Sequence, residues 1–362
     1  MRHVRATASS AREARVGRSG PGRIIALVVS VGITLAVSGI LYYWFHEAAS
    51  LGPGFQGTME PASDNAETIQ EVYVLVFWLA AAVFVGVMIL TLAFSLMFKE
   101  QEGVEAVQTH GNSRLEILWT FIPIVIVAVM AVPTFSAIVQ IEGDAPEEAM
   151  EVTAIGHQWW FEFQYPDSDV TTATDLHVPV GQPVLVNLQS VDVIHSFWVP
   201  RLMGKKDMVP GHENQIWFTP TEEGVFLGQC AEFCGLSHAK MRFRVIVHSP
   251  EDYAAWLENA QSPAAEPQEE LAQRGLEVFS NPASQCIACH TIEGVSAGTL
   301  GPNLTHVGSR TAIAGAWLEN TPENMAEWIR QPDLVKPGSL MPDTGLSEED
   351  IEAVVAYLQS LQ

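Results

Sequence analysis

Three long apolar runs limit what this 362-residue chain can fold into. Residues 24–45, 72–98 and 117–139 contain no charged side chain. A helix needs about 20 apolar residues to cross a bilayer, and each run is at least that long. The sequence therefore predicts a membrane protein. A short polar loop joins the second and third runs, so we expect an antiparallel transmembrane helical hairpin over residues 70–141.

The positions of lysine and arginine predict the orientation, because these residues collect on the cytoplasmic side of membrane proteins. Six arginines lie within residues 1–23, and Lys99 and Arg114 flank the loop of the hairpin. Residues 46–71 and 140–200 contain neither lysine nor arginine. We therefore expect everything beyond about residue 140 to lie outside the cytoplasm.

Residues 1–50 allow two interpretations. The first apolar run is longer than the apolar region of a usual signal peptide, and the bulky stretch "YYWF" lies where small residues should precede cleavage. The following "EAAS" is nevertheless a possible cleavage site. The segment is either a signal peptide or an extra transmembrane helix, and both place the C-terminal part outside.

Beyond the hairpin the pattern changes twice. Residues 150–258 consist of short β-prone runs separated by glycine and proline turns, which predicts an all-β sandwich or barrel with a helix at its end. Residues 259–268 are rich in proline, alanine and glutamate and are predicted to be a linker. Residues 269–362 have helical patterns, including a Ser347-x-x-Asp350 cap, and predict a small all-α domain.

The charge balance argues against nucleic acid as a partner. The formal net charge is −24, and no basic patch follows the arginine-rich N-terminus. An acidic surface of this kind attracts basic proteins and acts mainly on the rate of encounter.

Four possible metal ligands lie within one turn-rich stretch, "GQCAEFCGLSHAKM". They are Cys230, Cys234, His238 and Met241. Cysteines outside the cytoplasm usually form disulfides, but thiolate, imidazole and thioether are soft or borderline donors that suit copper. The stretch "DVIHSFWVP" adds His195, which is either a further ligand or a structural histidine.

A second motif, "SQCIACHTIEG", has the C-x-x-C-H spacing of Cys286, Cys289 and His290. In an exported helical domain this spacing predicts covalent haem c rather than a redox disulfide. A sixth ligand is then needed, and the candidates are Met341 on the loop "PGSLMPDTG" and Met325 inside a predicted helix. A methionine ligand would raise the reduction potential relative to a second histidine.

The copper motifs and the hairpin together resemble subunit II of the haem-copper cytochrome c oxidases, and the C-terminal region resembles class I cytochrome c. The combination is similar to the caa-type subunit. The resemblance implies a cupredoxin domain with a dinuclear, mixed-valence copper A centre. It implies bridging ligands Cys230 and Cys234, with His195 and Met241 on one copper, and His238 and the backbone carbonyl of Glu232 on the other.

The same resemblance assigns further roles. It favours Met341 as the axial ligand of the haem and makes the Pro302 carbonyl an acceptor for His290. Trp159 resembles an exposed tryptophan through which electrons arrive from a cytochrome c, although a tryptophan packed in the barrel is the alternative.

Two acidic residues also receive roles from the family. Glu116 resembles the acid at the mouth of a proton channel, against the alternative that it is simply solvated at the membrane interface. The side chain of Glu232 is implied to reach a magnesium ion shared with subunit I.

We therefore expect the electron-input subunit of a proton-pumping terminal oxidase in a bacterial plasma membrane, with its copper and haem domains on the periplasmic side. Electrons would come from a quinol-cytochrome c reductase or a soluble cytochrome c, and pass through haem c and copper A to haem a in subunit I, where oxygen is reduced. The alternatives are the same role in a haem-copper nitric oxide reductase and, in a different class, a membrane copper-binding or copper-trafficking protein. Subunit II of a quinol oxidase is disfavoured because that group lacks these copper ligands.

Overall fold

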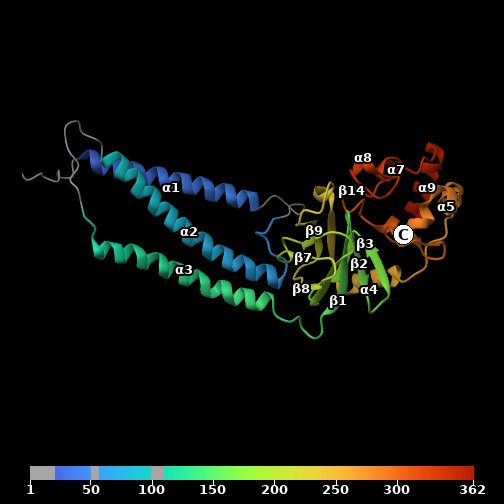
Figure 1. Ribbon diagram of the computed structural model, residues 1–362, viewed down its shortest axis with the longest axis horizontal. Coiled ribbons are helices and arrows are strands. Elements are labelled where there is room, and N and C mark those ends of the chain that lie inside the picture. Colours follow the sequence, from blue (N-terminus) through green and yellow to red (C-terminus); the bar gives the residue numbers. More distant parts are fainter. Residues whose placement is uncertain (1–20, 50–56, 99–109) are drawn as a thin grey trace, which may run out of the picture. The chain divides into compact units, whose positions relative to one another are not determined.

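The computed structural model describes residues 21–49, 57–98 and 110–362 (Figure 1). It divides into one unit of residues 1–48 and 74–130 and a second unit of residues 49–73 and 131–362. The arginines before residue 21, part of the candidate cleavage site, and Lys99 lie outside the described residues.

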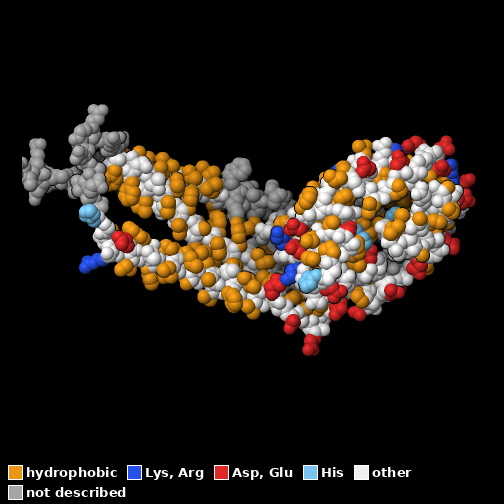
Figure 2. All heavy atoms as spheres, in the orientation of Figure 1, with side chains coloured by type: hydrophobic (Ala, Val, Ile, Leu, Met, Phe, Trp, Pro, Cys, Tyr) orange, Lys and Arg blue, Asp and Glu red, His pale blue; other side chains and the backbone are white. Residues whose placement is uncertain are grey.

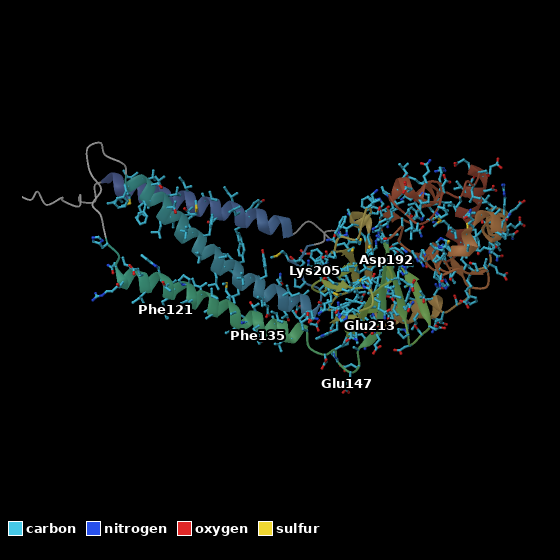
Figure 3. The ribbon with its side chains drawn as sticks, viewed as in Figure 1. Phe121, Phe135, Glu147, Asp192, Lys205 and Glu213 are labelled. Carbon is cyan, nitrogen blue, oxygen red and sulfur yellow. The ribbon has the colours of Figure 1, made fainter. Side chains whose placement is uncertain are left out.

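The apolar runs form helices. They are α1 (Pro21–Ala49), α2 (Asp64–Met97) and α3 (Ser113–Ile141). Of the helices described, α2 and α3 are long and apolar enough to cross a membrane, whereas α1 contains a shorter apolar stretch, Leu27–Tyr43. Hydrophobic side chains cover these helices in Figure 2. Phe121 and Phe135, labelled on α3 in Figure 3, are 60% and 70% exposed, as expected of side chains that face lipid or a partner helix.

Helix α2 begins before its apolar run because polar side chains cap it. Ser63 Oγ accepts a hydrogen bond from the backbone N–H of Ala66 at 3.1 Å. Asp64 Oδ1 accepts from the backbone N–H of Thr219 at 2.9 Å and ties the first turn to the β domain. A side chain that satisfies the free N–H groups of a first turn stabilises a helix end by about 1 kcal/mol.

The predicted β domain is a sandwich of two five-stranded sheets. The first sheet has the order β3 (Val170–Ala173), β2 (Trp160–Tyr165), β1 (Met150–His157), β5 (Val184–Ser190), β8 (Asn214–Phe218). The second has the order β4 (Asp175–Pro179), β10 (Arg242–His248), β9 (Gly224–Cys230), β6 (His195–Trp198), β7 (Lys206–Met208). Buried and more exposed residues alternate along β1 and β10, as expected of strands with one face toward a core.

Aromatic rings fill the space between the sheets. The ring of Phe243 lies 4.7 Å from that of Phe161 and 4.5 Å from that of Phe197, measured between centroids. Gly228 is paired with Phe243 across the strands, and a Cβ at Gly228 would lie 2.3 Å from the ring. Glycine is therefore required at this position of β9, next to the strand end that carries a candidate ligand.

A partly buried histidine pair lies on the outer side of the second sheet, under α4 (Pro250–Ala260). The ring of His177 stacks on Trp256 with centroids 4.2 Å apart, and its Nδ1 lies 2.8 Å from Nε2 of His248. Burial, followed by the charges of His248 and Arg310, lowers the pKa of His177 to about 3. The native domain therefore keeps this imidazole neutral.

Acid should destabilise the sandwich through His177. The unfolded chain binds a proton here below its ordinary pKa of about 6.5, but the native state does not until about 3. The free energy of unfolding should thus fall as the pH drops below about 6.5, by at most about 1.4 kcal/mol per pH unit for this group. Calorimetric unfolding of the full chain between pH 7 and 4 should show a shallower loss for His177→Phe. The exposed His212→Phe is the control, and equal slopes in both variants would contradict the assignment.

The C-terminal domain is helical. Its helices are α5 (Glu270–Ser280), α6 (Cys286–Cys289), α7 (Pro322–Arg330), α8 (Pro332–Val335) and α9 (Glu348–Ser360). Helices α5 and α9 pack closely at Gly275, where a Cβ would lie 2.0 Å from the carbonyl oxygen of Ala353. Ser347 accepts from the N–H of Asp350 at 3.2 Å, so the predicted cap of α9 is confirmed.

Candidate functional site

The second sheet brings the predicted soft ligands to one end of the sandwich. His195 begins β6 and Cys230 ends β9, and these two strands are paired. The chain then turns through residues 231–241 before β10, and this turn carries Cys234, His238 and Met241. Adjacent strands in one sheet and a return loop therefore explain why ligands far apart in sequence meet.

The ligand atoms lie within contact of one another. Cys230 Sγ is 3.8 Å from Cys234 Sγ and 3.9 Å from His195 Nδ1. Cys234 Sγ is 3.6 Å from His238 Nδ1 and 3.7 Å from Met241 Sδ. The two cysteine sulfur atoms thus lie at the centre of the cluster, each next to an imidazole nitrogen.

The cysteines are free thiols rather than a disulfide. The hydrogen bond with Cys234 lowers the pKa of Cys230 to about 4, against the effect of burial and with help from His195. The same hydrogen bond raises the pKa of Cys234. Because the thiolate is the form that binds a metal, the geometry holds Cys230 ready for one.

Glu232 contributes its backbone to the cluster. Its carbonyl oxygen lies 3.2 Å from Cys230 Sγ, whereas its side chain is exposed. Two thiolates, two imidazoles, one thioether and one carbonyl form a donor set for two soft ions, with the thiols between them. The residues present therefore fit a dinuclear copper site.

Asp192 is a functional residue that the sequence did not reveal. Its Oδ1 accepts from His195 Nε2 at 2.7 Å, which leaves Nδ1 directed at Cys230. Burial alone would lower the pKa of His195, but Asp192 and Cys230 raise it overall. A carboxylate on the outer nitrogen of a ligating histidine fixes its orientation. The only signal was an acid three residues before the histidine, which is a common arrangement.

Removal of this carboxylate should weaken metal binding. In Asp192→Ala, copper affinity should fall about 10-fold to 100-fold, the usual effect of losing an outer partner of a ligating histidine. Competition between the full chain and a copper chelator measures this affinity. The control is Asp167→Ala, which removes one exposed carboxylate and keeps the contact between Asp192 and His195. Equal affinities in the two variants would show that Asp192 does not orient His195.

The C-x-x-C-H motif forms helix α6 and the residue that follows it. His290 Nδ1 donates to the Pro302 carbonyl at 2.9 Å, so Nε2 is the nitrogen that can face an iron. Gly301 packs against the same ring, since a Cβ there would lie 2.7 Å from His290 Cε1. Burial lowers the pKa of His290 and keeps it in the neutral form that a metal needs.

The two methionine candidates have different surroundings. Met325 is 3% exposed in α7 and its Sδ accepts from Gln359 Nε2 at 3.8 Å, which is the environment of a core residue. Met341 is partly exposed and packs at the edge of the same hydrophobic cluster as Cys286. Met341 therefore lies at the edge of the cluster against which Cys286 also packs, whereas Met325 lies inside it.

The expectation of an exposed tryptophan is wrong for this chain. Trp159 is 7% exposed and belongs to the core cluster of the sandwich. Its Nε1 donates to the carbonyl of Cys234 at 3.1 Å, and Gly338 of the cytochrome domain lies against its ring. The cytochrome domain therefore lies against the indole for which the family resemblance implied exposure.

Glu116 lies in the first turn of α3 and its side chain is exposed. Asn112 caps this turn, with Oδ1 accepting from the N–H of Arg114 at 3.1 Å. The carboxylate is therefore at a helix start, where a negative charge is favourable. This placement is compatible both with a proton-channel acid and with a solvated one.

Family models match three parts of the chain. Residues 47–137 match the transmembrane domain of cytochrome c oxidase subunit II, and residues 169–249 match its periplasmic domain. Residues 272–362 match cytochrome c. The three matches follow one another in the order of the hairpin, the sandwich and the helical domain.

Curated relatives share most of the chain. The chain is similar to "Cytochrome c oxidase subunit 2" of Alkalihalophilus pseudofirmus, with 38% identity over 84% of this chain and 90% of the relative. The protein of the same name from Bacillus sp. (strain PS3) is 34% identical over 87% of this chain and 94% of the relative. That of Bacillus subtilis is 32% identical over 86% and 93%.

Proposed function

Because this chain belongs to the cytochrome c oxidase subunit II family and ends in a cytochrome c domain, we propose that it delivers electrons through its own haem c and a copper A centre to haem a of subunit I. As an oxidoreductase subunit it partners with other oxidase subunits. We also propose that the oxidase pumps protons and lies in the bacterial plasma membrane. Its electron donor would be a quinol-cytochrome c reductase or a soluble cytochrome c. The hairpin belongs in the membrane and the soluble part outside.

One observation carries the copper assignment. Three sulfur atoms and two imidazole nitrogens converge from β6, β9 and the loop before β10, with neighbouring donors 3.6–3.9 Å apart. We assign His195, Cys230, the Glu232 carbonyl, Cys234, His238 and Met241 to two copper ions. Bound copper supplies a one-electron carrier, and bound haem c supplies another.

The chain's own residues hold these donors still. Paired strands position His195 and Cys230, and the Asp192 carboxylate fixes the imidazole. Ligands that do not move on a change of oxidation state keep the reorganisation small. In the helical domain Cys286, Cys289, His290 and Met341 are assigned to haem c, with Pro302 as the hydrogen-bond partner of His290.

The remaining assignments are part of the same proposal. We propose a role for Glu116 at a proton-channel mouth, and a magnesium ion near the exposed Glu232 side chain at the contact with subunit I. The proposed domain limits are 70–141, 150–258 and 269–362, with a linker at 259–268 and a signal peptide or extra span at 1–50.

Metal analysis and spectroscopy of the full chain purified in detergent test this proposal. We expect two copper ions with a mixed-valence EPR spectrum and one covalently attached low-spin haem. Zinc, a single mononuclear copper ion, or the absence of thioether-linked haem would each overturn the corresponding assignment.

A further inference from the structure

The indole of Trp159 is in contact with both cofactor-binding loops. The copper loop is the turn of residues 231–241 that carries Cys234, His238 and Met241. A Cβ at Gly235 in this loop would lie 3.1 Å from Trp159 Cζ2. A Cβ at Gly338, in the loop that leads to Met341, would lie 2.8 Å from Trp159 Cη2. Only residues without a side chain allow both loops to approach the ring this closely.

The indole is also hydrogen-bonded to the copper loop. Trp159 Nε1 donates to the carbonyl of Cys234, and Gln158 Nε2 donates to the same oxygen at 2.7 Å. Gly338 lies three residues before Met341 in the sequence. The indole therefore connects the backbone of a proposed copper ligand with the loop of a proposed haem ligand.

Lys336 anchors this loop on the sandwich. The residue is 3% exposed, and its Nζ donates to the carbonyl of Ala314 at 2.9 Å and to the carbonyl of Trp159. A buried polar group is costly unless it is hydrogen-bonded, so these acceptors determine where the loop lies. Ser237 Oγ adds a hydrogen bond to the Pro337 carbonyl at 2.8 Å.

Further contacts between the sandwich and the cytochrome domain support the same docked position. The N–H of Arg242 donates to the carbonyl of Gly315 at 3.0 Å, and its guanidinium lies 4.9 Å from the ring centre of Trp317. Lys240 Nζ donates to the carbonyl of Val335 at 2.6 Å. Backbone acceptors with fixed directions specify one docked position rather than a loose electrostatic encounter.

We propose that Lys336 and Gly338 are positioning residues that dock the haem-ligand loop on Trp159, so that the rate of electron transfer from haem c to the copper centre depends on this contact. The inference rests on the proposed function. The transfer moves one electron and no proton, and it leaves the haem iron oxidised by one unit and the copper pair reduced by one. A separate cytochrome then reduces haem c and has no access to Trp159.

Gly338→Ala tests the contact with the ring. Gly345→Ala is a matched control, because both glycines have positive φ (+84° and +64°) but a Cβ at Gly345 meets open space. Electron transfer from photoreduced haem c to copper is measured in the purified oxidase. Gly338→Ala should slow it several-fold, because the added Cβ must move the loop away from the indole, whereas Gly345→Ala should leave it near the wild-type rate. Equal rates in the two variants would overturn the proposal.

Lys336→Met tests the anchor, with the exposed Lys205→Met as control. Hydrogen exchange of peptides covering residues 157–161 and 234–241 should become faster in Lys336→Met only, and electron transfer should slow with it. Unchanged haem and copper spectra show that both domains remain folded. Protection and rate that both stay at the wild-type level would refute the role of Lys336. A wild-type oxidase without haem-to-copper transfer would instead refute the proposed function.

Discussion

Replacement of Cys230 by serine should almost abolish oxygen consumption by the assembled oxidase. Cys230 Sγ contacts Cys234 Sγ, His195 Nδ1 and the Glu232 carbonyl, so one substitution removes the central donor of the cluster. A hydroxyl is a hard donor that binds copper poorly. The loss should exceed about a hundredfold, since changes even to outer partners of metal ligands cost 10-fold to 100-fold.

The block should occur between the two cofactors. Haem c in Cys230→Ser should still be reduced by an external donor, and it should then remain reduced. Ser196→Ala is a close control, because Ser196 is buried beside His195 in β6 and its hydroxyl has no hydrogen-bond partner among the residues that the structure describes. Oxygen consumption at the wild-type level in Cys230→Ser would remove the copper assignment altogether.

Replacement of Met341 by histidine should lower the reduction potential of haem c. A thioether ligand raises the potential relative to a second imidazole. The decrease should be on the order of 100 mV, because axial ligands set haem potentials over a range of about 0.8 V. A redox titration of the visible spectrum measures it.

Met325→Leu is the matched control for the haem ligand. The side chain of Met325 is buried in α7 and its sulfur faces Gln359, so a leucine of similar volume should leave the potential unchanged. If instead the potential falls in Met325→Leu and not in Met341→His, the axial ligand is Met325.

Local patterns were sufficient to predict the elements and the candidate ligands. Uncharged runs identify the helices α2 and α3, because hydropathy depends only on neighbouring residues. The spacing of Cys230, Cys234 and His238 was enough to suggest a soft metal. The sequence could not show that the Glu232 carbonyl faces Cys230 while its side chain is exposed, because peptide orientation depends on the folded loop.

Features that depend on contact between the two soluble domains were missed or wrong. Lys336 lies in a polar loop of an acidic domain and would ordinarily be solvated, yet two backbone carbonyls hold it buried. The family resemblance implied an exposed Trp159, but the side chain lies in the core cluster of the sandwich, with Gly338 against its ring. Asp192 is likewise unremarkable in the sequence, because its role depends on the direction of the His195 ring.

The buried position of Trp159 also affects how the chain works with other carriers. A diffusing redox protein must leave after each delivery, so its contacts have to be weak and brief. A donor that shares the polypeptide never needs to leave, and it can therefore keep a buried lysine and a close glycine–indole contact through every cycle. Fast exchange of partners is then required only at the outer surface of the cytochrome domain.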